Sequence, residues 1–438
     1  MLKRKAAERL RAWKESRARR GLMVMGARQV GKTTTIREFA RAHYDVVAEV
    51  NFFEDERAVE TISGATSAKD LFLRITALSG KEVVAGRTLV FLDEIQECGD
   101  VLTWLKFLEE STDCDYVLSG SRLGLDAFDV RSLPVGSLET MEMFPLDFEE
   151  FCWADGIAEP VIDEARECFL GRRPIPAFVH DKLMDAFYRY VLVGGMPAAT
   201  WAYAETNALP ETRAAQEAIV DLYEYDISKY VIDKTESRQI RMVYESIPGQ
   251  LNRANKRFKF TRLSKSARFA NLETAFDWLE SAGVALETIR VSDPSFPLGL
   301  TEDRSSFKLY MNDVGLLTSR LMREVDLDIL NRKSSMNFGS IFENAVAQEL
   351  RSQGFPLFYY QSTSVGEIDF LLQDASGDVS LCEVKSGKDY RRHSAMSNLL
   401  GTDNYRFKGA YVLCDGNLAQ EGPITYAPIY LAGMLRLG

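Results

Sequence analysis

Near its N-terminus the chain reads Gly26-Ala27-Arg28-Gln29-Val30-Gly31-Lys32-Thr33. Two glycines that flank four residues and are followed by Lys and Thr match the P-loop pattern. An apolar run at 22–25 predicts a strand before this stretch, and the apolar spacing in 34–42 predicts a helix after it. In that setting the glycines let backbone N–H groups face a phosphate chain, and the helix N-terminus adds a favourable dipole. The alternative, a chance glycine-rich turn, is disfavoured by such regular flanks.

Two residues of the loop have predicted roles with ATP. Lys32 would reach the terminal phosphates, and the Thr33 hydroxyl would bind Mg²⁺. Farther along, an apolar run at 88–92 ends in Asp93 and Glu94. A strand that ends in two acids is the second half of a P-loop site, because it brings Asp93 beside Thr33 to hold Mg²⁺. Glu94 is then predicted to orient the attacking water, which makes Glu94 and Lys32 the catalytic candidates.

Another predicted strand, 115–118, leads into a polar stretch that ends at Ser121. A polar residue at a strand end can sense the γ-phosphate, and Ser121 is the candidate, although a turn or helix N-cap serine is equally open. Strands that alternate with helices in this order predict a parallel, three-layer α/β sheet within residues 1–150. The residues predicted to contact the nucleotide are Gly26, Ala27, Arg28, Gln29, Val30, Gly31, Lys32, Thr33, Thr34, Asp93 and Ser121.

The composition is that of a globular protein with several domains. A chain of 438 residues is too long for one core. The 6 cysteines form no C-x-x-C pair and the 3 histidines are too few for a His-based metal site, so a reducing cytoplasm is expected. No apolar run approaches the length of a membrane span. The net charge of −11 excludes a surface that is basic throughout, but it leaves room for a local basic site.

A family pattern is carried by Leu92-Asp93-Glu94-Ile95-Gln96, Leu118-Ser119-Gly120-Ser121, Phe144-Pro145-Leu146-Asp147-Phe148-Glu149-Glu150-Phe151 and Val193-Gly194-Gly195-Met196-Pro197. On these stretches the chain resembles, over nearly its whole length, the AAA-like prokaryotic ATPases that carry a C-terminal domain of unknown function (the AAA_14/DUF4143 family). The resemblance implies a protein that binds and hydrolyses ATP with Mg²⁺. One departure is Ser137, where the family has Arg, and it weakens any role for an Arg of this segment at the nucleotide. Arg122 and Arg131 stay open as arginine fingers or as surface residues.

The middle of the chain predicts helices and then a winged helix. A hinge or tight turn is expected at 194–197. Residues 260–284 have the layout of a helix-turn-helix, with 284–289 and 307–310 as wing strands. The recognition helix, 271–280, carries three acids, which disfavours entry into a DNA groove, so DNA contact and protein packing both stay open. Beside it, residues 252–268 contain no acid and seven cations: Arg253, Lys256, Arg257, Lys259, Arg262, Lys265 and Arg268.

The last hundred or so residues follow the order of parts in the PD-(D/E)XK nucleases. Glu343 lies on a predicted helix, Asp369 on a strand, and Glu383-Val384-Lys385 on the next strand. Since side chains alternate along a strand, Glu383 and Lys385 share a face. We expect Glu343, Asp369 and Glu383 to bind Mg²⁺, and Lys385 to position or activate the attacking water. The alternative is a degenerate nuclease fold kept for binding or assembly.

These expectations give an α/β protein with four parts. They are an AAA-like P-loop ATPase domain at 1–150, a helical connector at 151–235, a winged-helix-like domain at 236–330, and a nuclease-like, restriction-endonuclease-like α/β domain at 331–438. The leading hypothesis is a cytoplasmic ATPase coupled to a DNA-binding or DNA-cleaving C-terminal module. The alternative is an ATP-dependent regulatory switch whose nuclease-like domain is inactive and binds a protein partner. A third, separate hypothesis is a standalone ATP-dependent nuclease in mobile-element or defence biology. A homo-oligomer stays open.

Overall fold

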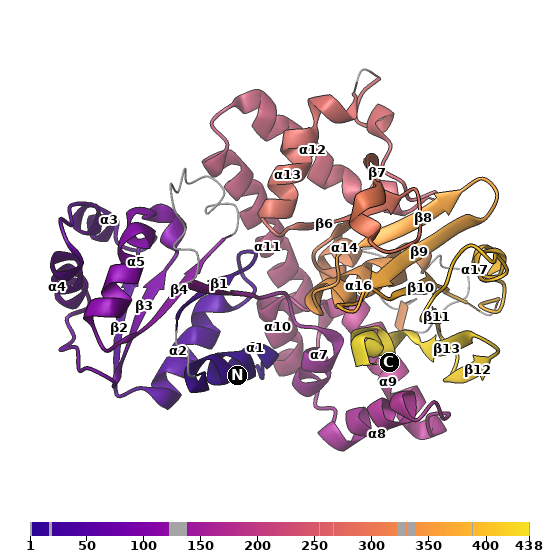
Figure 1. Ribbon diagram of the computed structural model, residues 1–438, viewed down its shortest axis with the longest axis horizontal. Helices are drawn as coiled ribbons and strands as arrows, with labels where there is room; N and C mark the ends of the chain where they lie inside the picture. Colours follow the sequence, from indigo (N-terminus) through magenta and orange to yellow (C-terminus); the bar gives the residue numbers. More distant parts are fainter. Residues whose placement is uncertain are drawn as a thin grey trace. The chain divides into compact units, whose positions relative to one another are not determined.

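The computed structural model describes residues 2–16, 20–121, 138–253, 255–265, 267–321, 329–330, 338–387 and 389–437 (Figure 1). The chain forms two compact units. The N-terminal unit is Lys3–Phe144 with Ser281–Gly283, and the C-terminal unit is Met1–Leu2 with Pro145–Glu280 and Val284–Gly438. No described helix is long and apolar enough to cross a membrane.

The N-terminal unit is built on a five-stranded sheet in the order β2-β3-β4-β1-β5. All of its strand pairs are parallel, as the sequence predicts. Because parallel strands end at the same edge, the P-loop after β1 lies at the edge where β3 and β4 also end. The strands are β1 (Gly21–Met25), β2 (Val46–Asn51), β3 (Thr88–Asp93), β4 (Asp115–Gly120) and β5 (Leu138–Glu142).

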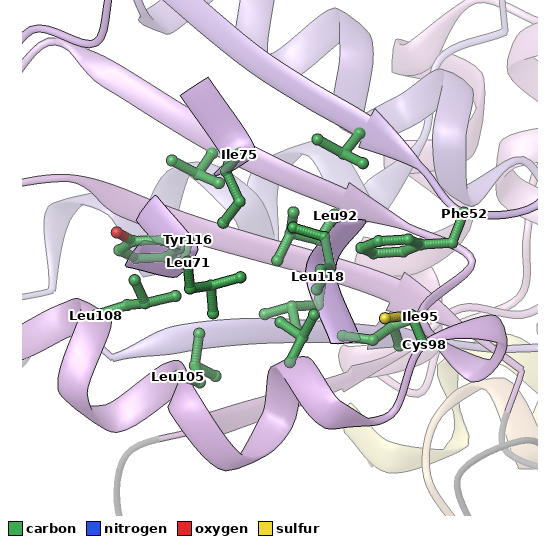
Figure 2. Close-up of a cluster of buried hydrophobic side chains, with 14 of the residues drawn as sticks. Phe52, Leu71, Ile75, Leu92, Ile95, Cys98, Leu105, Leu108, Tyr116 and Leu118 are labelled. Atoms are coloured by element: carbon green, nitrogen blue, oxygen red, sulfur yellow. The ribbon is translucent and has the colours of Figure 1, made fainter. Parts of the chain in front are cut away.

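Helices cover both faces of this sheet, which confirms the predicted three-layer architecture. All six residues of β3 are buried, so neither face is open to solvent. On one face α3, α4 and α5 enclose an apolar core around Leu71, Leu92 and Leu118 (Figure 2). The helices of this unit are α1 (Lys5–Glu15), α2 (Lys32–His43), α3 (Glu56–Ser63), α4 (Ala68–Ser79) and α5 (Asp100–Ser111), with a short 3-10 turn, η1 (Ile95–Glu97).

The C-terminal unit combines helices with a mixed sheet of eight strands in the order β12-β13-β11-β10-β9-β8-β6-β7. The strands are β6 (Ala285–Val291), β7 (Glu302–Met311), β8 (Phe358–Ser362), β9 (Gly366–Gln373), β10 (Val379–Val384), β11 (Gly409–Cys414), β12 (Ala419–Glu421) and β13 (Ile424–Pro428). The helices are α7 (Phe148–Ala154), α8 (Glu159–Leu170), α9 (Ala177–Val193), α10 (Pro197–Thr206), α11 (Leu209–Tyr230), α12 (Lys234–Leu251), α13 (Glu273–Ser281), α14 (Val314–Leu321), α16 (Gly339–Ser352) and α17 (Ser394–Leu400). The described residues of this unit also form 3-10 segments: η2 (Phe260–Arg262), η3 (Phe269–Asn271), η4 (Leu298–Thr301) and η5 (Ile429–Leu437).

The strands predicted as a wing, β6 and β7, do pair antiparallel, but β6 also pairs with β8. The expected boundary at residue 330 therefore falls within one sheet. The compact units number two. The division into four domains stays a prediction.

The expected first helix of the helix-turn-helix is instead the 3-10 turn η2 followed by irregular chain. The reason is a cluster of aromatic rings to which this segment contributes Phe258 and Phe260. Residues two apart do not share a face of an α-helix, so both rings reach one cluster only from a non-helical backbone. The second helix, α13, lies where the sequence predicts it.

The Gly194-Gly195 turn lies inside the C-terminal unit, where it is packed too closely to work as a hinge. A Cβ at Gly195 would lie 2.0 Å from the Leu146 carbonyl oxygen, and one at Gly194 would lie 2.1 Å from Asp313 Oδ1. The Gly195 N–H donates to Asp313 Oδ2 at 2.6 Å, and Leu146 N–H donates to the Gly195 carbonyl at 2.6 Å. Burial raises the pKa of Asp313 to about 6, although the backbone donors oppose this shift. The family motifs at 144–151 and 193–197 thus contact each other at the Gly194-Gly195 turn.

We expect Gly195→Ala to destabilise the C-terminal unit by about 1–3 kcal/mol, because the added methyl overpacks against backbone that cannot yield locally. The thermal midpoint and urea midpoint of the full chain measure this effect. Gly249→Ala in α12 is the matched control, because a Cβ there meets nothing within 4 Å. Equal midpoints for the two variants would show that Gly195 is not in close contact with Leu146.

Candidate functional site

The P-loop is a turn that needs glycine at both ends. At Gly26 a Cβ would lie 2.2 Å from the Met143 carbonyl oxygen, so no side chain fits. At the other end Gly31 has a φ of 91°, a left-handed conformation that glycine adopts without strain. Gly31 is the N-cap of α2. Arg4 supports the loop from outside, since its Nη1 donates to the Val30 carbonyl at 2.7 Å. The pattern of the sequence did not predict this role for Arg4.

Lys32 is the first residue of α2 and is buried inside the loop. Its Nζ donates to the carbonyl oxygens of Gly26 at 3.0 Å and Ala27 at 2.9 Å. Burial lowers the pKa of Lys32, while the nearby Glu94 and Asp93 raise it. An ammonium that is removed from water and held by neutral carbonyls is ready to bind an anion, and the phosphates of a nucleotide are such anions.

Asp93 ends β3 at the position that the sequence predicts, beside Thr33. The Thr33 hydroxyl donates to Asp93 Oδ2 at 2.9 Å, and Asn51 Nδ2 donates to the same oxygen at 3.0 Å. Ser119 Oγ donates to Asp93 Oδ1. Burial raises the pKa of Asp93, and the hydrogen bond from Ser119 opposes this rise. Asn51 and Ser119 were not predicted, although each lies at or next to the carboxyl end of a parallel strand adjacent to β3.

The oxygens of Thr33 and Asp93 fit Mg²⁺, which prefers hard oxygen ligands and shares them with water and phosphate. Burial raises the pKa of Asp93, and a cation bound beside it would favour its charged form. When bound, Mg²⁺ would neutralise charge on the phosphates.

Glu94 follows Asp93 in a left-handed conformation with a φ of 56°. Such a backbone is uncommon for a residue with a side chain, and it is often found in active sites. Gln96 Nε2 donates to Glu94 Oε2, and Gln96 Oε1 accepts a hydrogen bond from Ser121 N at 3.3 Å. The predicted sensor, Ser121, is therefore joined to Glu94 through Gln96, whereas Ser119 is the serine whose hydroxyl contacts Asp93. Arg122, Arg131 and Ser137 lie outside the described residues.

A second cluster of charges lies in the C-terminal unit, around the side chain of Lys308 on β7. This side chain is fully buried, at 0% exposure. Its Nζ lies 2.7 Å from Glu367 Oε1, 3.4 Å from Asp369 Oδ1 and 3.5 Å from Glu343 Oε2. Burial by itself lowers the pKa of Lys308, but Tyr310 and the three acids raise it well above its ordinary value. The residues Lys308, Glu343, Glu367 and Asp369 are called the Lys308 cluster below.

The predicted metal ligands are therefore partnered by lysines. Glu343 contacts Lys256 as well as Lys308. Glu383 Oε2 lies 2.8 Å from Lys385 Nζ, and Glu383 Oε1 accepts from Met396 N at 3.1 Å. Among the residues that the structure describes, no group of three or more His, Cys, Asp or Glu side chains is placed to hold a metal ion. The donor set in this arrangement does not fit the expected Mg²⁺. Lys308 and Glu367 were not predicted, and Lys256 was predicted only as one of the seven cations of 252–268. The sequence signal for Lys308 is a lone lysine in the apolar strand 307–311.

Three family models match the chain, one mainly in the N-terminal unit and two in the C-terminal unit. Residues 18–152 match the family model AAA_14, described as an AAA domain. Residues 184–326 match DUF8612 and residues 338–431 match DUF4143, both described as domains of unknown function. The N-terminal unit is a P-loop ATPase domain of the AAA class. The chain joins this AAA_14 domain to a C-terminal DUF4143 domain, as the motif resemblance implied.

Comparisons with whole proteins add little. No curated protein sequence matches the chain. The solved structures that resemble it include the Aeropyrum pernix ORC2 protein, with 14% identity over 76% of this chain and 95% of that chain and a TM-score of 0.35. The Aeropyrum pernix ORC1 protein in complex with DNA has 13% identity over 75% and 94% and a TM-score of 0.31. The Thermotoga maritima RuvB Holliday junction branch migration motor has 14% identity over 66% and 90% and a TM-score of 0.29. Scores this low carry no argument about what this chain binds.

Two substitutions test the predicted catalytic residues. We expect Lys32→Ala to lose ATP binding, because the phosphates lose their main cation, and Glu94→Gln to bind ATP but hydrolyse it at least 100-fold more slowly, roughly the contribution of one positioned base. Binding of a fluorescent ATP analogue and steady-state phosphate release measure the two effects. Hydrolysis by Glu94→Gln at the wild-type rate would show that Glu94 does not orient the water.

The two serines at the end of β4 are separated by a paired test. We expect Ser119→Ala to lower hydrolysis by about tenfold and to raise the Mg²⁺ concentration needed for half-maximal rate, because a hydrogen bond to a charged group is worth about 1.5 kcal/mol or more. Ser121→Ala is the matched control and should shift the Mg²⁺ requirement less, since its link to Glu94 uses the backbone N–H. The opposite order would restore Ser121 as the sensor.

Proposed function

We propose that this protein binds ATP with Mg²⁺, hydrolyses it, and uses the nucleotide state to regulate a C-terminal unit that binds nucleic acid. The observation that carries the ATPase part is the convergence of Lys32, Thr33, Asp93 and Glu94 at the carboxyl edge of one parallel sheet. Lys32 binds the terminal phosphates, Thr33 and Asp93 hold Mg²⁺, and Glu94 orients water toward the γ-phosphate. Gln96 and Asn51 keep the two acids in place.

The nucleic-acid part of the proposal rests on the basic segment, residues 255–265 with 267–268. Five of its cations are exposed, namely Arg257, Lys259, Arg262, Lys265 and Arg268. None of the five forms an ion pair with an acid in the described part of the chain. Cations that are fixed and unpaired at a surface bind the phosphate backbone without reading sequence.

The fold anchors this segment at Phe258 and Lys259. Phe258 is buried and its ring stacks on Phe307 at 5.6 Å, while its N–H donates to the Phe307 carbonyl at 2.8 Å. Gln250 Nε2 donates to the Lys259 carbonyl oxygen at 3.1 Å, and Gln250 Oε1 accepts from the Lys259 N–H at 3.3 Å. Because Phe258 and Phe260 alternate with Arg257 and Lys259, the rings anchor the segment while the cations face solvent.

The contact would be made by this segment rather than by a recognition helix in a groove. The exposed face of α13 carries Glu273, Asp277 and Glu280, which phosphates would repel. The same acidic face favours the second candidate, a regulatory switch whose C-terminal unit binds a basic protein partner. Steady-state ATP hydrolysis with and without single-stranded and double-stranded DNA or RNA separates the two, since only the first candidate expects nucleic acid to bind and to change the rate.

The cellular setting follows from the thiols. All six cysteines are free and five of them are buried. Free thiols fit a reducing compartment, so the cytoplasm is the proposed location. Assembly into a homo-oligomer stays a prediction.

We expect the triple variant Arg257→Gln, Lys259→Gln, Arg262→Gln to bind nucleic acid of any sequence more weakly. The salt dependence should also become less steep, by about 0.9 in the log–log slope for each phosphate that the variant no longer neutralises. Fluorescence anisotropy at several salt concentrations measures both quantities. The control removes three exposed cations elsewhere in the same unit, with Arg172→Gln, Lys182→Gln and Lys234→Gln. Equal reductions in affinity for the two variants would mean that net charge, not the basic segment, governs binding.

A further inference from the structure

We infer that Lys308 takes the place of a metal ion, so that the Lys308 cluster is an internal ion-pair network and not a centre for metal-dependent cleavage. The inference goes beyond ATP hydrolysis and nucleic-acid binding and does not depend on either. It assigns a role to a lysine that neither the motif pattern nor the family models single out.

The position of Lys308 among the acids supports this inference. Lys308 Nζ lies within 4 Å of acids from two other elements, Glu343 on α16 and both Glu367 and Asp369 on β9. These include two of the three acids that the nuclease pattern assigns to the metal. The Lys308 side chain has no exposure to solvent, and Lys308 itself is paired with Thr288 of β6. An ammonium enclosed in this way is a permanent part of the fold and supplies the positive charge that the acids require.

The acid oxygens also have partners already. Glu343 accepts from Lys256 through Oε1, and its Oε2 accepts from Tyr310 at 3.0 Å and lies near Lys308. Asp369 Oδ2 accepts from the Val384 N–H at 2.9 Å, while Oδ1 faces Lys308. Mg²⁺ requires free oxygen ligands in a near-octahedral shell at about 2.0–2.1 Å. Oxygens that contact a lysine ammonium already have the counter-charge that Mg²⁺ would supply, unlike those of Asp93, whose hydrogen-bond donors are neutral.

The network also joins separate elements of the C-terminal unit. It ties β7, α16 and β9 together and, through Lys256, attaches the start of the basic segment to α16. Breaking one partner of a buried ion pair leaves an uncompensated charge, which destabilises strongly. Two of the three acids of the nuclease pattern, Glu343 and Asp369, are therefore explained by folding, without a reaction.

The test uses the full chain without nucleotide or nucleic acid. Isothermal titration with MnCl₂ is carried out on the wild type, Asp369→Asn and Asp93→Asn, the last of which identifies any Mn²⁺ bound at the P-loop. We expect no Mn²⁺ binding that depends on Asp369. A Mn²⁺ site in the wild type that is absent from Asp369→Asn would overturn the inference.

A second measurement tests the lysine directly. We expect Lys308→Met to lower the thermal midpoint by roughly 5–10 °C, because the acids lose their counter-charge. Adding Asp369→Asn to Lys308→Met should recover part of that decrease. In proteins that also carry Asp93→Asn, which removes the P-loop site, Mn²⁺ should raise the midpoint of Lys308→Met but not that of the protein with Lys308 intact. Lys182→Met, at an exposed lysine of the same unit, is the matched control. If Lys308→Met has the same thermal midpoint as Lys182→Met, the ammonium is not the counter-ion of the cluster and the inference fails. If Lys308→Met does not fold, the titration of the wild type and Asp369→Asn still decides.

Discussion

The hydrogen bond from Thr33 to Asp93 joins the P-loop to the strand next but one in the sheet, and the nucleotide site depends on it. It forms because β1, β3 and β4 run parallel and end at one edge. Parallel order thus converts two motifs that are distant in sequence into neighbours. The same geometry brings in Asn51 from the end of β2 and Ser119 from β4, so that Asp93 is held from three sides.

Both units bury carboxylates, and they stabilise them differently. Asp93 receives hydrogen bonds from hydroxyl and amide groups, which satisfy its oxygens without cancelling its charge, and its pKa is raised by burial. The Asp369 side chain is 13% exposed, and the nearby Lys308 and Lys256 outweigh its burial and lower its pKa. A carboxylate with neutral donors attracts a cation, whereas one beside an ammonium does not. This difference favours an ion site in the N-terminal unit and a closed network in the C-terminal unit.

Much of the N-terminal unit was predictable because its signals are local. Apolar runs, two glycines and an acid pair at a strand end require only neighbouring residues, and they indicated the parallel sheet and the pairing of Thr33 with Asp93. The contact of Ser119 with Asp93 was not predicted because the expected strand ends at residue 118, whereas β4 extends through Gly120. The sensor role of Ser121 stays a prediction. The Lys308 cluster was not predictable in this way. Its charge balance depends on which strand lies beside β6, a long-range pairing that no local pattern encodes.

The winged-helix pattern shows the same limit from another side. Its strands exist and pair as expected, yet β6 continues into the sheet that holds Asp369 and Glu383. The basic segment is consequently attached to that sheet twice, through the packing of Phe258 on Phe307 and through the ion pair of Lys256 with Glu343. Residues that a sequence pattern assigns to separate DNA-binding and DNA-cleaving domains are parts of one body. One carboxylate of the nuclease pattern, Glu343, then acts on the basic segment by holding its first cation, Lys256, beside α16.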